Sequence, residues 1–91
     1  MQLTDHQCRQ FRERAKALAD RLEAANQKVL DNPSFSQEFK EAVVKMALPY
    51  AIILTEVEQG THPKDAELIQ SSLDKVDQHC HIIEQDQLNA A

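Results

Sequence analysis

The chain contains very few residues that interrupt a helix. Its 91 residues include one glycine and three prolines, so few positions favour a tight turn. Tryptophan is absent and aromatic residues make up 4% of the chain, which argues against an aromatic ligand cage or a base-stacking platform. Long helices are therefore the simplest way to organise residues 1–91, and the length suits one domain.

Long apolar runs and cysteines are also scarce. The densest apolar run, residues 47–54, is far shorter than the roughly 20 residues that cross a bilayer. The two cysteines occur in a sequence without the pattern of a secretory signal peptide, which is typical of free thiols in a reducing compartment. We therefore expect a cytoplasmic protein with no membrane association.

What the sequence does have is helical periodicity. Apolar residues recur at alternating steps of three and four along three segments, roughly 4–31, 34–59 and 62–88. The first apolar seam is Cys8, Phe11, Ala15, Leu18, Leu22, Ala25 and Val29. The second is Phe39, Val43, Met46, Tyr50, Ile53 and Val57, and the third is Ala66, Ile69, Leu73, Val76, Cys80 and Ile83. Short connections make successive helices antiparallel, so the pattern predicts an all-α, up-down-up three-helix bundle with long helices.

Each predicted helix has a recognisable start. Thr4 with Gln7 forms the pattern of a capping box, and Ser34 with Gln37 repeats it before the second segment. Pro63 suits the first turn of the third helix, where its missing N–H is not needed.

The predicted ends are equally distinct, with one conflict inside the second helix. Residues 32–33 (Asn-Pro) end the first segment, because a residue before proline is driven out of the α region. Gly60 is the expected left-handed residue that closes the second. Pro49 removes a backbone hydrogen bond in mid-helix, so the second helix is predicted to kink there or to split, which would give a four-helix variant.

The residues that could carry chemistry do not form a known pattern. His79, Cys80 and His81 are consecutive, and at 100° per residue the two imidazoles point about 160° apart, so they cannot share a metal ion. No serine nucleophile elbow or glycine-rich phosphate loop is present. We expect no catalytic activity, small-molecule substrate, metal or cofactor, and surface or interface roles for the histidines.

Charge is unevenly distributed along the chain, whose net charge is −5. Residues 1–31 hold six of the ten basic residues, whereas residues 32–91 hold ten of the fifteen acids and no arginine. An acidic chain suits a basic protein partner better than nucleic acid, which requires clustered cations. The Arg-rich face of the first helix keeps a nucleic-acid-associated regulator as the alternative function.

The charges beside the seams predict how the helices align. Arg14, Arg21 and Lys28 repeat every seven residues beside the first seam, and Asp77 and Glu84 flank the third. Because the first and third helices run parallel in this fold, these stripes are predicted to face each other.

The two cysteines test the same helix order. Cys8 and Cys80 lie near opposite ends of the two parallel helices, so about 20 Å or more separates them. That separation excludes an intrachain disulfide.

Apolar residues that lie off the seams are the main functional signal. Leu48, Ala51 and Ile52 lie roughly opposite the second seam, and Leu68 and Ile82 lie off the third. A second apolar stripe on a helix commonly means that another surface covers it. We therefore predict a partner-binding surface on a non-catalytic interaction module that modulates a larger protein, as an inhibitor, immunity protein, chaperone or anti-activator does. A homodimer is also expected.

Overall fold

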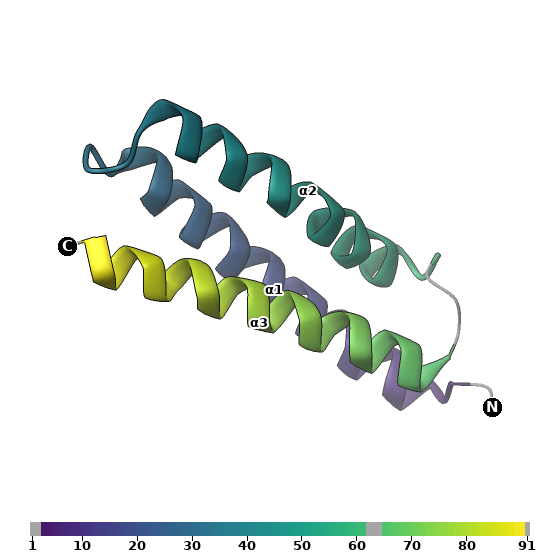
Figure 1. Ribbon diagram of the computed structural model, residues 1–91. Helices are drawn as coiled ribbons and strands as arrows, with labels where there is room; N and C mark the ends of the chain where they lie inside the picture. The colour runs from purple at the N-terminus through teal and green to yellow at the C-terminus, as the bar shows by residue number, and fades with distance from the viewer. Residues whose placement is uncertain (1–2, 62–64, 91) are drawn as a thin grey trace.

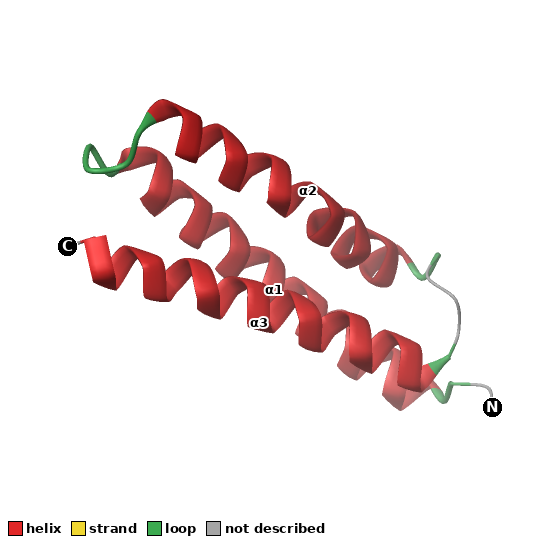
Figure 2. Cartoon of the chain, viewed as in Figure 1, coloured by secondary structure: helices red, strands yellow, loops and turns green. Residues whose placement is uncertain are grey.

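The computed structural model describes residues 3–61 and 65–90, and it confirms the predicted bundle. Its helices are α1 (Asp5–Asp31), α2 (Gln37–Gln59) and α3 (Ala66–Ala90), of 27, 23 and 25 residues. They lie side by side along one long axis, with α1 and α3 parallel and α2 antiparallel to both (Figure 1). The described residues contain no β-strand (Figure 2).

The start and end of α1 lie where the sequence predicts them. The Oγ1 atom of Thr4 accepts a hydrogen bond from the backbone N–H of Gln7 at 3.1 Å, and Gln7 Oε1 accepts one from the backbone N–H of Thr4 at 3.0 Å. This reciprocal capping box satisfies N–H groups that have no partner within the helix. At the other end Asn32, in an extended conformation, caps the helix before Pro33.

The predicted N-cap of α2 is wrong by two residues. Ser36, not Ser34, is the N-cap, and its hydroxyl oxygen accepts a hydrogen bond from the N–H of Phe39 at 3.1 Å. Ser34 instead belongs to the turn, where its N–H donates to Asn32 Oδ1. Two serines are equally good caps in sequence, and the turn after Pro33 decides between them. Gly60 closes α2 with φ of 74°, as predicted.

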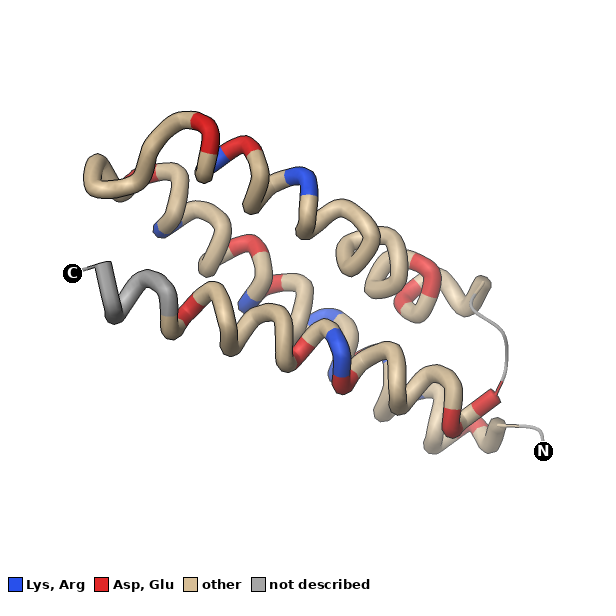
Figure 3. Tube along the Cα trace, in the orientation of Figure 1, with Lys and Arg blue, Asp and Glu red and all other residues tan. Residues whose placement is uncertain are grey.

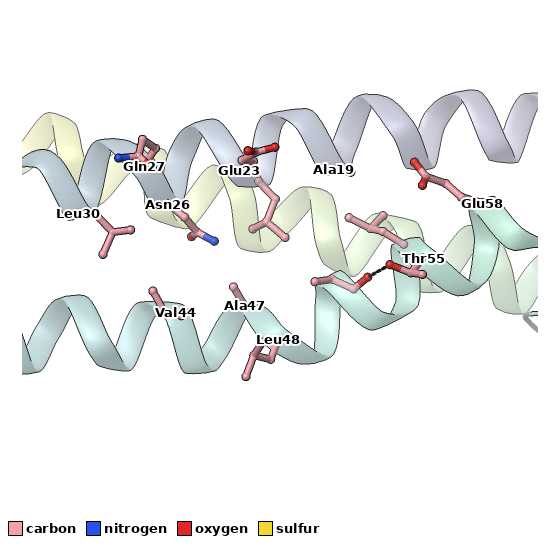
Figure 4. Close-up of a pocket in the computed structure, with 13 residues that line it drawn as sticks. Ala19, Glu23, Asn26, Gln27, Leu30, Val44, Ala47, Leu48, Thr55 and Glu58 are labelled. Atoms are coloured by element: carbon pink, nitrogen blue, oxygen red, sulfur yellow. Dashed lines mark hydrogen bonds between the residues drawn. The ribbon is translucent and has the colours of Figure 1, made fainter.

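The second helix is continuous through Pro49, so the split that would have produced a fourth helix does not occur. Beyond Leu48 the ribbon of α2 changes direction (Figure 4), as expected where proline removes one N–H and crowds the preceding turn. The hydroxyl of Thr55 donates to the carbonyl of Ala51 at 2.9 Å, a contact that also favours bending.

Helix α3 begins later than predicted. The Oδ1 atom of Asp65 accepts hydrogen bonds from the N–H groups of Glu67 and Leu68, at 3.0 and 3.3 Å, in the manner of an N-cap. The predicted role of Pro63 lies outside the described residues. No helix in the described part of the chain has the length and apolar character needed to cross a membrane.

The predicted seams form the core on α1 and α3, and the seam on α2 needs one correction. The core includes Ala15, Leu18, Leu22, Ala25 and Val29 of α1 and Ile69, Leu73, Val76, Cys80 and Ile83 of α3. On α2, however, Met46 is 60% exposed, whereas Ala47 and Leu54 are buried. The buried face of α2 is therefore rotated toward Ala47, because α2 packs mainly on α1 and makes few contacts with α3.

The predicted charge stripes of α1 and α3 do meet. Arg21 binds both Asp77 and Glu84, the latter at 2.6 Å, and the hydrogen bonds that Glu84 accepts from Arg21 hold the pKa of Glu84 below its usual range. Arg14 pairs at 2.7 Å with Asp74, which is not one of the predicted stripe residues. Lys28 lowers the pKa of Glu84 only through the longer-range attraction of its charge.

Both cysteines are free, as predicted. Cys80 is completely buried, and burial raises the pKa of its thiol. Cys8 is half-buried beside Leu3 and Phe11 at the other end of the bundle.

Candidate functional site

A groove lies between α1 and α2, with a volume of about 400 Å³. None of its lining residues comes from α3, which lies behind the pair in Figure 4. The lining residues are Ala19, Leu22, Glu23, Asn26, Gln27, Leu30, Val44, Ala47, Leu48, Ala51, Leu54, Thr55 and Glu58. We call this surface the α1–α2 groove.

The groove exists because the residues between the two helices are small. Ala19 on α1 and Ala47 and Ala51 on α2 present only methyl groups, which leaves space above the buried side chains of Leu22 and Leu54. Alanine has the highest helix propensity, so these small residues leave space between the helices without weakening either helix. The floor of the groove is therefore apolar and is part of the folding core.

Large apolar side chains form part of the rim of the groove. Leu48 is 56% exposed, and Leu30 and Val44 are also exposed. Leu30 and Val44 lie at one end of the groove and Leu48 near its middle (Figure 4). Isolated exposed leucines are common, but a contiguous apolar surface around a groove is typical of an interaction site.

The middle of α2 carries no charge to interrupt this surface. Between Lys45 and Glu56 the helix has no charged residue, and Figure 3 shows this stretch as an uninterrupted uncharged segment. The charged residues that line the groove are both acids, Glu23 and Glu58. Lys40 and Lys45 help to line an adjoining hollow that also includes Leu30 and Val44.

One polar group in the groove lacks a partner. The Oδ1 atom of Asn26 is covered by protein atoms and has no hydrogen-bond partner among the described residues. An unsatisfied buried acceptor costs about 1–3 kcal/mol. The folding core alone does not explain why an amide lies on this face of α1.

Three of the five predicted binding residues lie together. Leu48 and Ala51 line the groove, and Ile52, 57% exposed, lies with them in a hollow on its α2 side. Ile82 lies elsewhere, in a second groove between α2 and α3. Leu68 is exposed on α3 and lines neither groove. The predicted set is therefore not one surface, because the α2 and α3 stripes face different sides of the bundle.

Leu30 and Val44 are not among the binding residues predicted from the sequence. Val44 precedes Leu48 by four residues, so the helical spacing that identified Leu48 and Ile52 could also have identified it. Leu30 follows the seam residue Val29 directly, and only the packing of α2 against α1 shows that it lies beside Val44 at one end of the groove.

The second groove has a volume of about 350 Å³, and His79 is one of the residues that line it. His79, predicted to lie at a surface or interface, is only 8% exposed within the chain, and its ring stacks on Tyr50 with 4.3 Å between ring centroids. Burial lowers the pKa of His79, and its Nε2 atom has no hydrogen-bond partner in the described structure. The predicted surface position of His79 is wrong, because Tyr50 of α2 covers this face of α3. The predicted interface role stays a prediction.

No group of three or more metal-binding side chains occurs among the described residues. His79 is buried whereas His81 is exposed, which fits the opposed directions expected for the two imidazoles. The carboxylate of Asp77 is bound to Arg21.

Comparisons of the chain with protein-family models, with curated proteins and with solved structures yield no match.

Proposed function

We propose that this protein is a non-catalytic, helical interaction module that binds and modulates a larger protein partner through the α1–α2 groove. The observation that carries the proposal is the set of exposed apolar side chains Leu30, Val44, Leu48 and Ile52 beside a groove with an apolar floor. Inhibitors, immunity proteins, chaperones and anti-activators all work by such binding, and the proposal covers this class.

Burial of these side chains by a partner would provide the binding energy. Removing apolar surface from water contributes about 25 cal/mol per Å². Leu48 and Ile52 are each more than half exposed and adjacent on α2, so they would supply the central contacts.

The charges of α1 favour this function over nucleic-acid binding. Arg14 and Arg21, two of the four arginines on α1, form ion pairs with acids of α3. Those contacts neutralise part of the basic face on which the alternative depends, and phosphate binding needs available cations.

The proposal also includes a homodimer and a cytoplasmic location. The dimer is proposed to form through the second groove, and the exposure of Met46 and Ile82, 60% and 52%, between α2 and α3 supports this choice. Free, unpaired cysteines fit a reducing compartment.

The test compares partner capture by matched variants. Tagged wild type, Leu48→Asp and Ile52→Asp are incubated with an extract of the source cells, and bound proteins are quantified by mass spectrometry. Leu68→Asp is the control, since it places the same charge at a comparably exposed leucine outside the groove. An unpaired charge buried in an interface costs several kcal/mol, so capture should fall by more than about 100-fold for the first two variants.

Circular dichroism checks whether each variant remains folded. Equal capture of the same proteins by wild type, Leu48→Asp and Ile52→Asp would contradict the proposal, because binding would then use another surface.

A further inference from the structure

We infer that the element of the partner that occupies the α1–α2 groove is an amphipathic helix of about three turns, flanked by lysine or arginine. The inference rests on the proposed function and adds the chemistry of the partner. It follows from the length of the groove, the residue types that line it and its unpaired acids.

The length of the groove fits a short helix. Its lining residues on α1 extend from Ala19 to Leu30, and those on α2 from Val44 to Glu58. At 1.5 Å per residue these stretches measure about 17 and 21 Å, which corresponds to three to four helical turns. A helix of that length presents apolar side chains at positions i, i+3 or i+4, and i+7 along one stripe.

The lining residues exclude the other common forms of peptide recognition. The described residues contain no strand edge to which an extended peptide could add. Proline-rich segments bind grooves lined by aromatic rings, and none of the residues that line this groove is aromatic. A helix satisfies its own backbone hydrogen bonds, so it can lie on an apolar floor that offers few donors or acceptors.

The small residues of the groove indicate large side chains on the occupant. Ala19, Ala47 and Ala51 line the groove from both helices and leave open the volume that an inserted leucine or phenylalanine would fill. Packing large residues against small ones is how facing helices interdigitate.

The acids of the groove define the flanks of the occupant. Glu23 and Glu58 are exposed, and neither forms an ion pair or hydrogen bond with another described residue. The α3 acids Asp74, Asp77 and Glu84 differ, because each already pairs with an arginine of α1. Unpaired carboxylates beside an apolar groove are complementary to lysine or arginine on the partner helix, and the chain's net charge of −5 adds a favourable long-range field.

The experiment uses two synthetic helical peptides of about 14 residues with the same leucine stripe, one with lysine flanks and the other with glutamate flanks. Binding to the full chain is measured by fluorescence anisotropy, and NMR chemical-shift changes locate the peptide. The lysine-flanked peptide should bind at least about tenfold more tightly, shift the signals of residues 19–30 and 44–58, and weaken with added salt.

Charge reversal in the groove provides the specific test. The double variant Glu23→Lys and Glu58→Lys should reverse the preference between the two peptides. Glu13→Lys, which changes an exposed acid of α1 outside the groove, should leave the preference unaltered. Leu48→Asp should weaken both peptides.

Other outcomes would overturn the inference. Equal binding of the two peptides, no binding of either, or a preference that survives charge reversal would show that the groove does not select a basic helix. A concentration-dependent dimer that Leu48→Asp abolishes in sedimentation would show that a second copy fills the groove. Loss of partner capture by Leu48→Asp decides the proposed function separately, so the two can fail independently.

Discussion

The two main helix interfaces of this bundle carry different kinds of side chain at their edges. Between α1 and α3, the buried apolar seam is flanked by the ion pairs of Arg14 with Asp74 and of Arg21 with Asp77 and Glu84. Between α1 and α2, the described residues form no ion pair across the interface, and the edge carries exposed apolar side chains such as Val44 and Leu48. Both interfaces share α1, so the difference arises from the outer residues of α2 and α3.

The difference indicates which edge is closed by the chain itself. Charged flanks suit a boundary with water, and they set the alignment of two helices while adding little stability. Apolar flanks gain free energy only when something covers them. The α1–α3 edge therefore resembles a finished boundary, and the α1–α2 edge resembles one half of an interface.

The largest effect should come from the shared core. Leu73 on α3 is completely buried, so Leu73→Ala removes apolar contacts and leaves a cavity, which typically costs 2–5 kcal/mol of unfolding free energy. Urea denaturation followed by circular dichroism measures the loss. A change below about 1 kcal/mol would mean that α3 is not held by its seam, and the contrast between the two edges would lose its basis.

A smaller effect is expected from the charged edge. Arg21→Glu places like charges beside Asp77 and Glu84 and should destabilise the fold by about 1 kcal/mol, since these side chains are partly exposed. Adding Glu84→Arg should restore part of that loss in a double-mutant cycle. Lys16→Glu, an exposed charge on the same helix, is the control. Strictly additive effects in the cycle would show that the ion pairs contribute nothing to alignment.

The stability that comes from packing α2 against α3 should depend on pH. The buried His79 has a lowered pKa, so the folded state favours the neutral ring that stacks on Tyr50. Stability should be constant above the ordinary value of about 6.5 and should fall as the pH drops below it, through the lower pKa of the folded state.

Denaturation at roughly pH 7.5 and pH 5.5 tests this dependence in wild type and in His79→Phe, which keeps a stacked ring but cannot titrate. His81→Gln is the control for an exposed histidine. The lining residues of this groove also include Lys75. An identical pH dependence in wild type and His79→Phe would show that His79 does not report on the contact between α2 and α3.

The smallest effect on stability should come from the apolar edge. Leu48 is more than half exposed, so Leu48→Asp should change the free energy of unfolding of the isolated chain by less than about 0.5 kcal/mol. The contrast with Leu73→Ala separates an edge residue from a core residue of the same type. A loss comparable to that of Leu73→Ala would mean that Leu48 belongs to the core and that the groove is not a free surface.

The sequence by itself determined the helices and much of their alignment. Thr4, Pro33 and Gly60 mark helix ends through local backbone chemistry, which is readable without knowledge of the fold. The seams of α1 and α3 follow from periodicity, because a helix places residues three and four apart on one face. The facing of Arg21 and Glu84 follows from the same periodicity once the helix order is known.

Only the tertiary structure decided which side chains beside the seams are buried by a neighbouring helix. The sequence predicts Leu48 and Ile52 as exposed apolar residues, and it gives no sign that Leu30 lies beside Val44 or that Met46 is exposed. Each of these outcomes depends on how far α2 turns toward α1 and away from α3. That rotation reflects the packing of side chains from separate helices, including the alanines of the groove and the ring of Tyr50 on His79. Periodicity describes one helix at a time, whereas burial depends on the helices around it.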